Sequence, residues 1–160
     1  MFGMTPFGLF HTLISLVAVV AGGIALFKHR EIGSRSGSGR SYVYFTAATC
    51  VTGLFIFHHG GFGKPHALAI ITLAVLAVAY AAERMQRPGS GWRYVSTLGY
   101  LLTLYFHVIP GFTETATRIP AGHPLVASPD DPRLQAVIGV AFLPFLYGGF
   151  LQVKRLRAAQ

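Results

Sequence analysis

The sequence is poor in charged residues and in cysteine. Asp, Glu, Lys and Arg together make up 11% of its 160 residues, whereas soluble domains carry about 25%. Hydrophobic residues make up 52%, and this combination is typical of an integral membrane protein. Cys50 is the only cysteine and lies inside an apolar run. An intramolecular disulfide is therefore excluded, and cysteine usage gives no information about the compartment.

Acidic residues are especially scarce. Five Asp and Glu stand against 13 Lys and Arg, which gives a formal net charge of +8. Such a charge can indicate nucleic-acid binding, but the basic residues fall in short loops between apolar segments rather than along one face. We therefore expect no nucleic-acid partner. The N-terminus also lacks the positive region and the small-residue cleavage site of a signal peptide, so the first apolar segment is predicted to be retained.

Five apolar segments have about the length that a helix needs to cross a lipid bilayer, which is about 20 residues. The second and fourth contain Thr, Ser, Tyr and His, and these side chains are expected to face the interior of a bundle. The predicted fold is all-α: one polytopic transmembrane domain, residues 1–160, with an outer cap loop over residues 113–133. The five predicted spans cover residues 7–27, 41–58, 66–83, 94–112 and 134–153.

The basic residues are distributed unevenly between alternate loops. Ten of the 13 Lys and Arg lie in the loop after the first span, the loop after the third span and the C-terminal tail. Only Lys64, Arg118 and Arg133 lie in the other two loops. The positive-inside rule then predicts that the C-terminus is cytoplasmic and that the N-terminus is outside.

Histidines gather on the predicted outer side. Five of them come from four different spans, at depths that differ by only about 6 to 8 Å at the helical rise of 1.5 Å per residue. His107 lies on a stripe with Gly99 and Thr103, and His11 lies on a stripe with Ser15. Stripes of small and polar residues mark close helix packing, so both side chains are expected to point at the bundle axis. The six outer histidines are His11, His58, His59, His66, His107 and His123.

Clustered imidazoles indicate a metal or haem site. Neutral imidazole is a good ligand for zinc, copper and iron, whether as a free ion or in haem. Ser15, Thr103 and Glu114 are predicted to orient the imidazoles through hydrogen bonds. The same histidines are also compatible with a proton-relay or substrate-binding cluster, or with purely structural hydrogen bonds. The predicted ligands of haem b come from His11, His58 and His107, and those of a bare copper, iron or zinc ion from His11, His58, His59, His66 and His107.

Two resemblances bear on this hypothesis. The turn at residues 28–33 (KHREIG), followed by Arg40 and an aromatic-rich segment, resembles a turn in small uncharacterised bacterial membrane proteins, which implies a bacterial inner-membrane location. The histidine pattern is similar to that of small b-type membrane cytochromes, which bind haem between histidines on facing helices. Typical two-haem members carry ligand pairs on both sides of the membrane. This chain has its helix histidines on one side, so the resemblance implies at most one haem.

The leading functional hypothesis is a redox metalloprotein in the lipid bilayer. If the protein is an enzyme, it is expected to be an oxidoreductase acting on a quinol or another small substrate near the outer surface. One alternative is an accessory, assembly or metal-chaperone subunit of a larger membrane oxidase, with a respiratory complex as its partner. The other is a small transporter or proton pathway. We rank it last, because we expect no acidic residue inside a span and five helices make a narrow pore.

Overall fold

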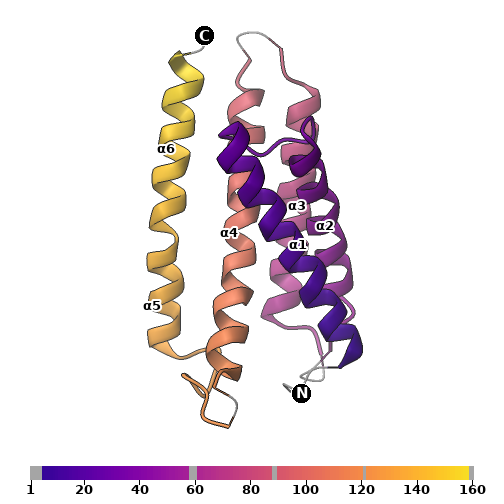
Figure 1. The fold of residues 1–160 in the computed structure, drawn as a ribbon, viewed down its shortest axis with the longest axis vertical. Coiled ribbons are helices and arrows are strands. Elements are labelled where there is room, and N and C mark those ends of the chain that lie inside the picture. Colours follow the sequence, from indigo (N-terminus) through magenta and orange to yellow (C-terminus); the bar gives the residue numbers. More distant parts are fainter. Residues whose placement is uncertain (1–4, 58–60, 88–89, 121, 159–160) are drawn as a thin grey trace.

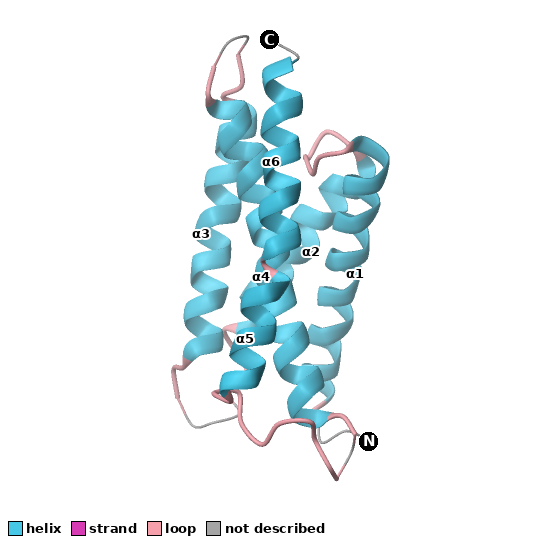
Figure 2. Ribbon diagram, turned by 90° about the vertical axis from the view of Figure 1, so that its left-hand side faces the viewer, coloured by secondary structure: helices cyan, strands magenta, loops and turns pink. Residues whose placement is uncertain are grey.

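The regular secondary structure is entirely helical in the computed structural model, which describes residues 5–57, 61–87, 90–120 and 122–158. The all-α prediction is therefore confirmed for this part of the chain. Figures 1 and 2 show the helices running between the same two ends of an elongated bundle. Their bounds are α1 (Pro6–His29), α2 (Gly37–Gly53), α3 (Lys64–Arg84), α4 (Trp92–Arg118), α5 (Pro132–Ala141) and α6 (Leu143–Ala158).

Four helical stretches are long and apolar enough to cross a membrane: α1, α3, α4 and the run from α5 through α6. Large apolar side chains such as Leu16, Ile71 and Leu146 lie exposed on them. A lipid environment would cover such side chains, whereas a soluble domain rarely exposes a large contiguous apolar surface. These features support the prediction of a membrane protein. The remaining long helix, α2, has 17 residues and is not among the four.

The second helix starts and ends earlier than the predicted span of residues 41–58. Ser36 caps α2, because its Oγ accepts the backbone N–H of Gly39 at 3.1 Å and so satisfies a donor of the first turn. The helix ends at Gly53, a residue type with low helix propensity. His58 lies outside the described residues.

The fourth helix is longer than the predicted span of residues 94–112. α4 continues through Pro110 to Arg118, so the first part of the predicted cap loop over residues 113–133 is helical. The ion pair between Glu114 and Arg118, four residues apart on the helix surface, favours this extra turn and a half. The connecting loop therefore begins at Ile119.

The predicted fifth span is divided into two helices at Phe142, just before Pro144. Proline has no backbone N–H, so the carbonyl of Val140, four residues earlier, cannot receive the usual helical hydrogen bond from it. The break lies where this bond is missing. α5 and α6 together still form one apolar stretch long enough to cross a membrane.

The helices pack as two antiparallel pairs, and α5 and α6 lie against one of these pairs. α1 packs on α2, α3 packs on α4, and contacts between α2 and α3 join the pairs (Figure 1). α5 and α6 lie along the side of α4 (Figure 2). Small residues allow close approach: Gly22 faces the ring of Tyr42, and Gly99 faces Ala79.

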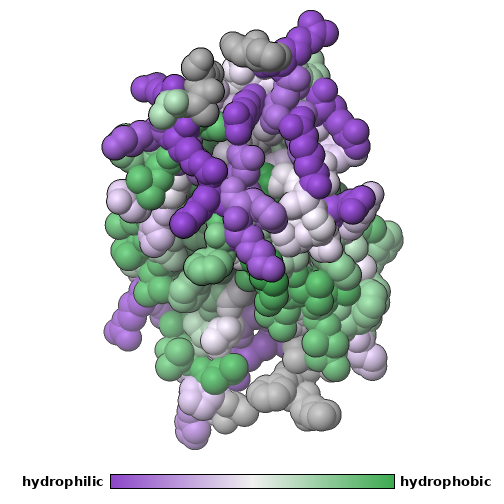
Figure 3. All heavy atoms as spheres, turned by 45° about the horizontal axis from the view of Figure 1, so that its top comes forward, coloured by the Kyte–Doolittle hydropathy of each residue, from purple (hydrophilic) through white to green (hydrophobic). Residues whose placement is uncertain are grey.

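The two ends of the bundle differ in charge. The loops after α1 and α3 and the C-terminal end of α6 lie together at one end, the top of Figure 1, which we call the basic end. Figure 3 brings this end forward and shows hydrophilic side chains over it and hydrophobic ones around the middle of the bundle. The opposite end is called the histidine end. The basic end carries Lys28, Arg30, Arg35, Arg40, Arg84, Arg87, Arg93, Lys154, Arg155 and Arg157.

The contact between α3 and α4 can be tested with Gly99→Val. A Cβ at residue 99 would lie 2.8 Å from the Cβ of buried Ala79, so the helices must separate. Overpacking of this kind costs about 1–3 kcal/mol. We expect a lower midpoint in thermal unfolding of the detergent-solubilised protein. Gly139→Val is the control, because a Cβ there meets no atom within 4 Å. Equal midpoints for the two variants would contradict the packing.

Candidate functional site: a buried polar axis

His107 joins three helices through both of its ring nitrogens. It lies on α4 with only 7% of its surface exposed. The hydroxyl of Ser15 on α1 is 3.2 Å from Nδ1, and the hydroxyl of Thr46 on α2 is 3.1 Å from Nε2. A neutral imidazole donates at one nitrogen and accepts at the other, and a hydroxyl can take either role. Both nitrogens therefore have a hydrogen-bond partner.

His11 lies one helical turn before Ser15 on α1. Its Nδ1 is 2.9 Å from the hydroxyl of Thr52 on α2. Its Cε1 would be 3.2 Å from a Cβ at Gly53, so the glycine makes room for the ring. His11 and His107, which the sequence predicts to point inward, both make contacts inside the bundle.

Tyr42 continues the network toward the basic end. Its hydroxyl is 2.7 Å from the hydroxyl of Thr103 and donates to the backbone carbonyl of Tyr100 at 3.4 Å. Tyr42, Tyr100 and Thr103 are fully buried, as is Thr46, one turn along α2 from Tyr42. Polar side chains thus fill the centre of the bundle beside the His107 contacts.

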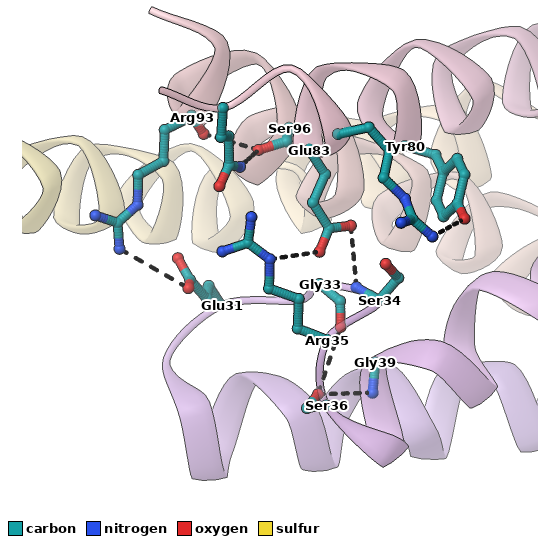
Figure 4. Close-up of polar contacts among 12 residues, drawn as sticks. Glu31, Gly33, Ser34, Arg35, Ser36, Gly39, Tyr80, Glu83, Arg93 and Ser96 are labelled. Atoms are coloured by element: carbon teal, nitrogen blue, oxygen red, sulfur yellow. Dashed lines mark hydrogen bonds and ion pairs between the residues drawn. The ribbon is translucent and has the colours of Figure 1, made fainter. Parts of the chain in front are cut away.

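Glu83 ends the network at the basic end of α3. It is 5% exposed. Its Oε2 accepts the Tyr100 hydroxyl at 2.7 Å and the backbone N–H of Ser34 at 3.0 Å. Arg35 Nε lies 3.9 Å from Oε1, and the Arg35 side chain is largely exposed (Figure 4). A buried carboxylate is costly unless it is bonded and paired, and these groups supply its partners.

Glu83 bears on our expectation that no acidic residue lies inside a span, because it is the last residue of the predicted span 66–83 and is buried in the last turn of α3. It sits on α3, a helix that can cross a membrane, and was overlooked because it closes the apolar run before Arg84. A signal was present in the spacing. Leu76 and Ala79 are buried on the same helix, and residue 83 follows them at the helical intervals that mark one face.

A cavity of about 250 Å³ lies beside Glu83 at the basic end. Figure 4 shows the Glu83 carboxylate pointing from the α3–α4 region toward the loop that carries Ser34 and Arg35. The cavity gives the buried carboxylate a route toward the surface. Its polar lining includes Glu31, Arg35, Ser36, Gln86, Ser96 and Thr97.

These connected side chains form what we call the polar axis. It runs from Glu83 at the basic end to His11 near the histidine end. Three steps along it join residues three or four apart on one helix rather than hydrogen-bonded side chains: Tyr100 to Thr103, Tyr42 to Thr46, and Ser15 to His11. Residues spaced in this way are neighbours on a helix surface. The axis comprises Glu83, Tyr100, Thr103, Tyr42, Thr46, His107, Ser15, His11 and Thr52.

Among the described residues, His66 makes no hydrogen bond to a member of this axis. It is 4% exposed, with its ring stacked on Phe57 at a centroid distance of 4.8 Å and near Phe62 at 5.4 Å. Nδ1 accepts the backbone N–H of Gly63 at 3.2 Å and so caps α3. Nε2 is buried and has no hydrogen-bond partner in the part of the chain that the structure describes.

The predicted ligand set is only partly brought together. In the described ranges, no group of three or more His, Cys, Asp or Glu side chains is arranged to hold a metal ion. His107 bonds Ser15, which lies one turn from His11 on α1, while His66 contacts aromatic rings. His58 and His59 lie outside the described residues, and His123 is exposed in the loop after α4.

The three predicted orienting residues have different contacts. Ser15 binds the ring of His107 directly. Thr103 pairs with the Tyr42 hydroxyl instead of a histidine. Glu114 is more than half exposed and pairs with Arg118. Of the three, only Ser15 therefore contacts a predicted ligand among the described hydrogen bonds.

Comparisons with known proteins add no assignment: no protein-family model, no curated protein and no solved structure matches this chain. The proposed function therefore rests on the site alone.

The bond between Thr46 and His107 predicts a measurable coupling. Thr46→Val keeps the shape of the side chain and removes the hydroxyl, which leaves Nε2 without its partner at 3.1 Å. Polar contacts between membrane helices contribute about 0.6–1.7 kcal/mol, and we expect a loss in this range in reversible unfolding from detergent micelles. In a double-mutant cycle, Thr46→Val should cost much less in the His107→Phe background than in the wild type, because the bond is already absent there.

Thr12→Val is the matched control. Among the described residues, the Thr12 hydroxyl bonds only the carbonyl of Gly8 on its own helix, and Thr12 is exposed. A cycle of Thr12→Val with His107→Phe should show no coupling. Coupling of the same size for both threonines would argue against the bond to His107.

Proposed function

We propose that this protein moves protons along the polar axis through a five-span membrane bundle. Ionisable groups inside membranes are costly and rare, and chains of Asp, Glu and His serve membrane proteins as proton relays. One observation carries the proposal: Glu83 and His107 are both buried, and hydroxyl-bearing side chains lie between them along the bundle. The polar axis connects a polar cavity at the basic end with His11 near the other end.

The proposed topology has α2 as the fifth span, the basic end in the cytoplasm and the N-terminus outside. With 17 residues, α2 is about 25 Å long at 1.5 Å per residue, against a hydrocarbon core of about 30 Å. Its position between α1 and α3 encloses it in protein on two sides. The charge difference between the ends supports the orientation, and a bacterial inner membrane is the location proposed.

Glu83 is the proposed exchange group at the cytoplasmic end. Its carboxylate lies beside the polar cavity and accepts the Tyr100 hydroxyl. Protons reach it through the cavity, and the Tyr100 hydroxyl is the next exchangeable group. Among the described residues, no hydrogen bond joins the two phenols: the Tyr42 hydroxyl bonds the backbone carbonyl of Tyr100, whereas the Tyr100 hydroxyl bonds Glu83. Transfer between them requires a side-chain movement or a bridging water, and we expect this step to limit the rate.

His107 is the proposed relay group in the outer half. An imidazole can take a proton on one nitrogen while it releases the proton of the other. The ring then does not stay positively charged inside the bundle. Thr46 and Ser15 hold one nitrogen each. From Ser15 the path continues one turn along α1 to His11, which is partly exposed and exchanges with the outer side.

The second candidate is the redox metalloprotein that binds haem b or a transition metal, alone or as a subunit of a respiratory complex that uses a quinol. The observation that favours it is the unpartnered Nε2 of buried His66, since buried nitrogens are normally bonded. Ligation through Nε2 would make Nδ1 the donor and break its contact with the Gly63 N–H. His58 and His59, close in sequence, are the natural co-ligands.

Proton transfer can be measured in liposomes with an enclosed pH-sensitive dye and a potassium diffusion potential. We expect the wild type to acidify the lumen faster than empty liposomes do. His107→Phe and Glu83→Gln should each lower the rate by about tenfold or more, because each removes a proton-exchanging group. Circular dichroism verifies that the variants are folded.

Asp130→Asn and His123→Asn are the controls for this assay, since both residues are exposed and lie off the polar axis. They should retain the wild-type rate. A wild type that is no faster than empty liposomes, or a folded His107→Phe variant with an unchanged rate, would overturn the proposal.

The metalloprotein candidate has a separate readout. It requires either a Soret band or stoichiometric copper, iron or zinc in the purified protein. Either signal should be lost in His66→Ala and kept in His107→Phe, because both nitrogens of His107 are already bonded. Colourless, metal-free protein that takes up neither haem nor metal on reconstitution would refute this candidate.

A further inference from the structure

An apolar groove lies on the opposite flank of α4 from the α3 contact. It encloses about 710 Å³ and is open along one side, a size in the range of ligand sites, about 300–1,000 Å³. Its lining residues come from α4, α1 and α6, and α4 lies between the other two helices in Figure 1. Its apolar lining includes Leu26, Leu101, Leu104, Phe145 and Leu151.

Two arginines close the groove at the basic end. Arg30 follows α1 and Arg155 lies on the last turn of α6, and both line the groove. In the described part of the chain, neither is paired with a carboxylate, although four other ion pairs form there. An apolar groove with two unneutralised guanidinium groups at one end matches a molecule with an apolar chain and an anionic head.

Gln152 supplies a third polar group at the same place. It is 9% exposed, and its Nε2 donates to the carbonyl of Arg30 at 3.2 Å. Its Oε1 is buried and has no hydrogen-bond partner among the described residues. An unpartnered acceptor beside two cations favours a head group that contains a hydroxyl donor as well as a phosphate.

We propose that this groove binds one acidic phospholipid of the adjacent leaflet. One acyl chain lies between α1 and α6, the phosphate lies between Arg30 and Arg155, and a head-group hydroxyl such as that of phosphatidylglycerol donates to Gln152. Basic pockets between transmembrane helices on the cytoplasmic side suit such head groups. α6 and α1 both pack on α4, and the lipid fills the space between them. The site is independent of proton transfer.

The test compares lipids on delipidated protein in detergent. Native mass spectrometry with added phosphatidylglycerol or phosphatidylcholine of the same acyl chains measures retention of the lipid. We expect phosphatidylglycerol to bind about tenfold tighter or more. The double variant Arg30→Gln/Arg155→Gln should remove this preference. Lys154→Gln/Arg157→Gln changes the net charge equally at residues that do not line the groove, and it should keep the preference.

Two further measurements separate the acyl chain from the phosphate. Gly148→Leu fills the groove, and its Cβ has room, with the nearest atom, Leu101 Cδ2, at 3.9 Å. This variant should lose the lipid while both arginines remain. Glycerol 3-phosphate alone should not raise the unfolding temperature. Equal affinity for the two lipids, an equal loss in the control double variant, or full stabilisation by glycerol 3-phosphate would each overturn the proposal.

Discussion

The interior of this bundle depends on the hydrogen bonds that His107 makes at both ring nitrogens. Lipid tails are as apolar as leucine, so apolar side chains give membrane helices little reason to associate, and small residues and polar contacts take over. Ser15 on α1 and Thr46 on α2 meet at this one imidazole on α4. Glycines allow close approach elsewhere in the bundle: Gly22 on α1 faces Tyr42 and Leu104, and Gly99 on α4 faces Ala79 on α3.

The same contacts give the bundle its proposed chemistry. A side chain that only joined helices would need no titratable neighbour. Beyond His107, however, buried Tyr42 and Tyr100 follow toward the basic end, where the Tyr100 hydroxyl bonds the buried carboxylate of Glu83. Glu83 has a polar cavity on one side, whereas His107 is enclosed. An ionisable group with access to the surface, joined to an enclosed imidazole, is the arrangement on which the proposal of proton transfer rests.

The sequence predicts the coarse fold well because lipid imposes simple rules of length and polarity. The all-α class and four helices able to cross a membrane follow from apolar runs, and the inward stripes of His11 and His107 follow from helical periodicity. Helix ends were less predictable, because Ser36 and Pro144 act through local hydrogen bonds. Of the two hydrogen-bond partners of His107, Ser15 was predicted from the sequence. Thr46 was missed because its role depends on how α2 turns toward α4, and Glu83 was missed because it stands at the end of an apolar run.

The most direct test of the account is ¹⁵N NMR of the His107 ring in lipid bilayers. We predict one protonated and one unprotonated nitrogen, both with shifts of hydrogen-bonded imidazole, and a change in both when Ser15→Ala and Thr46→Val are combined. Ring nitrogens with the shift of a metal-bound imidazole, or shifts that the double variant leaves unchanged, would contradict it.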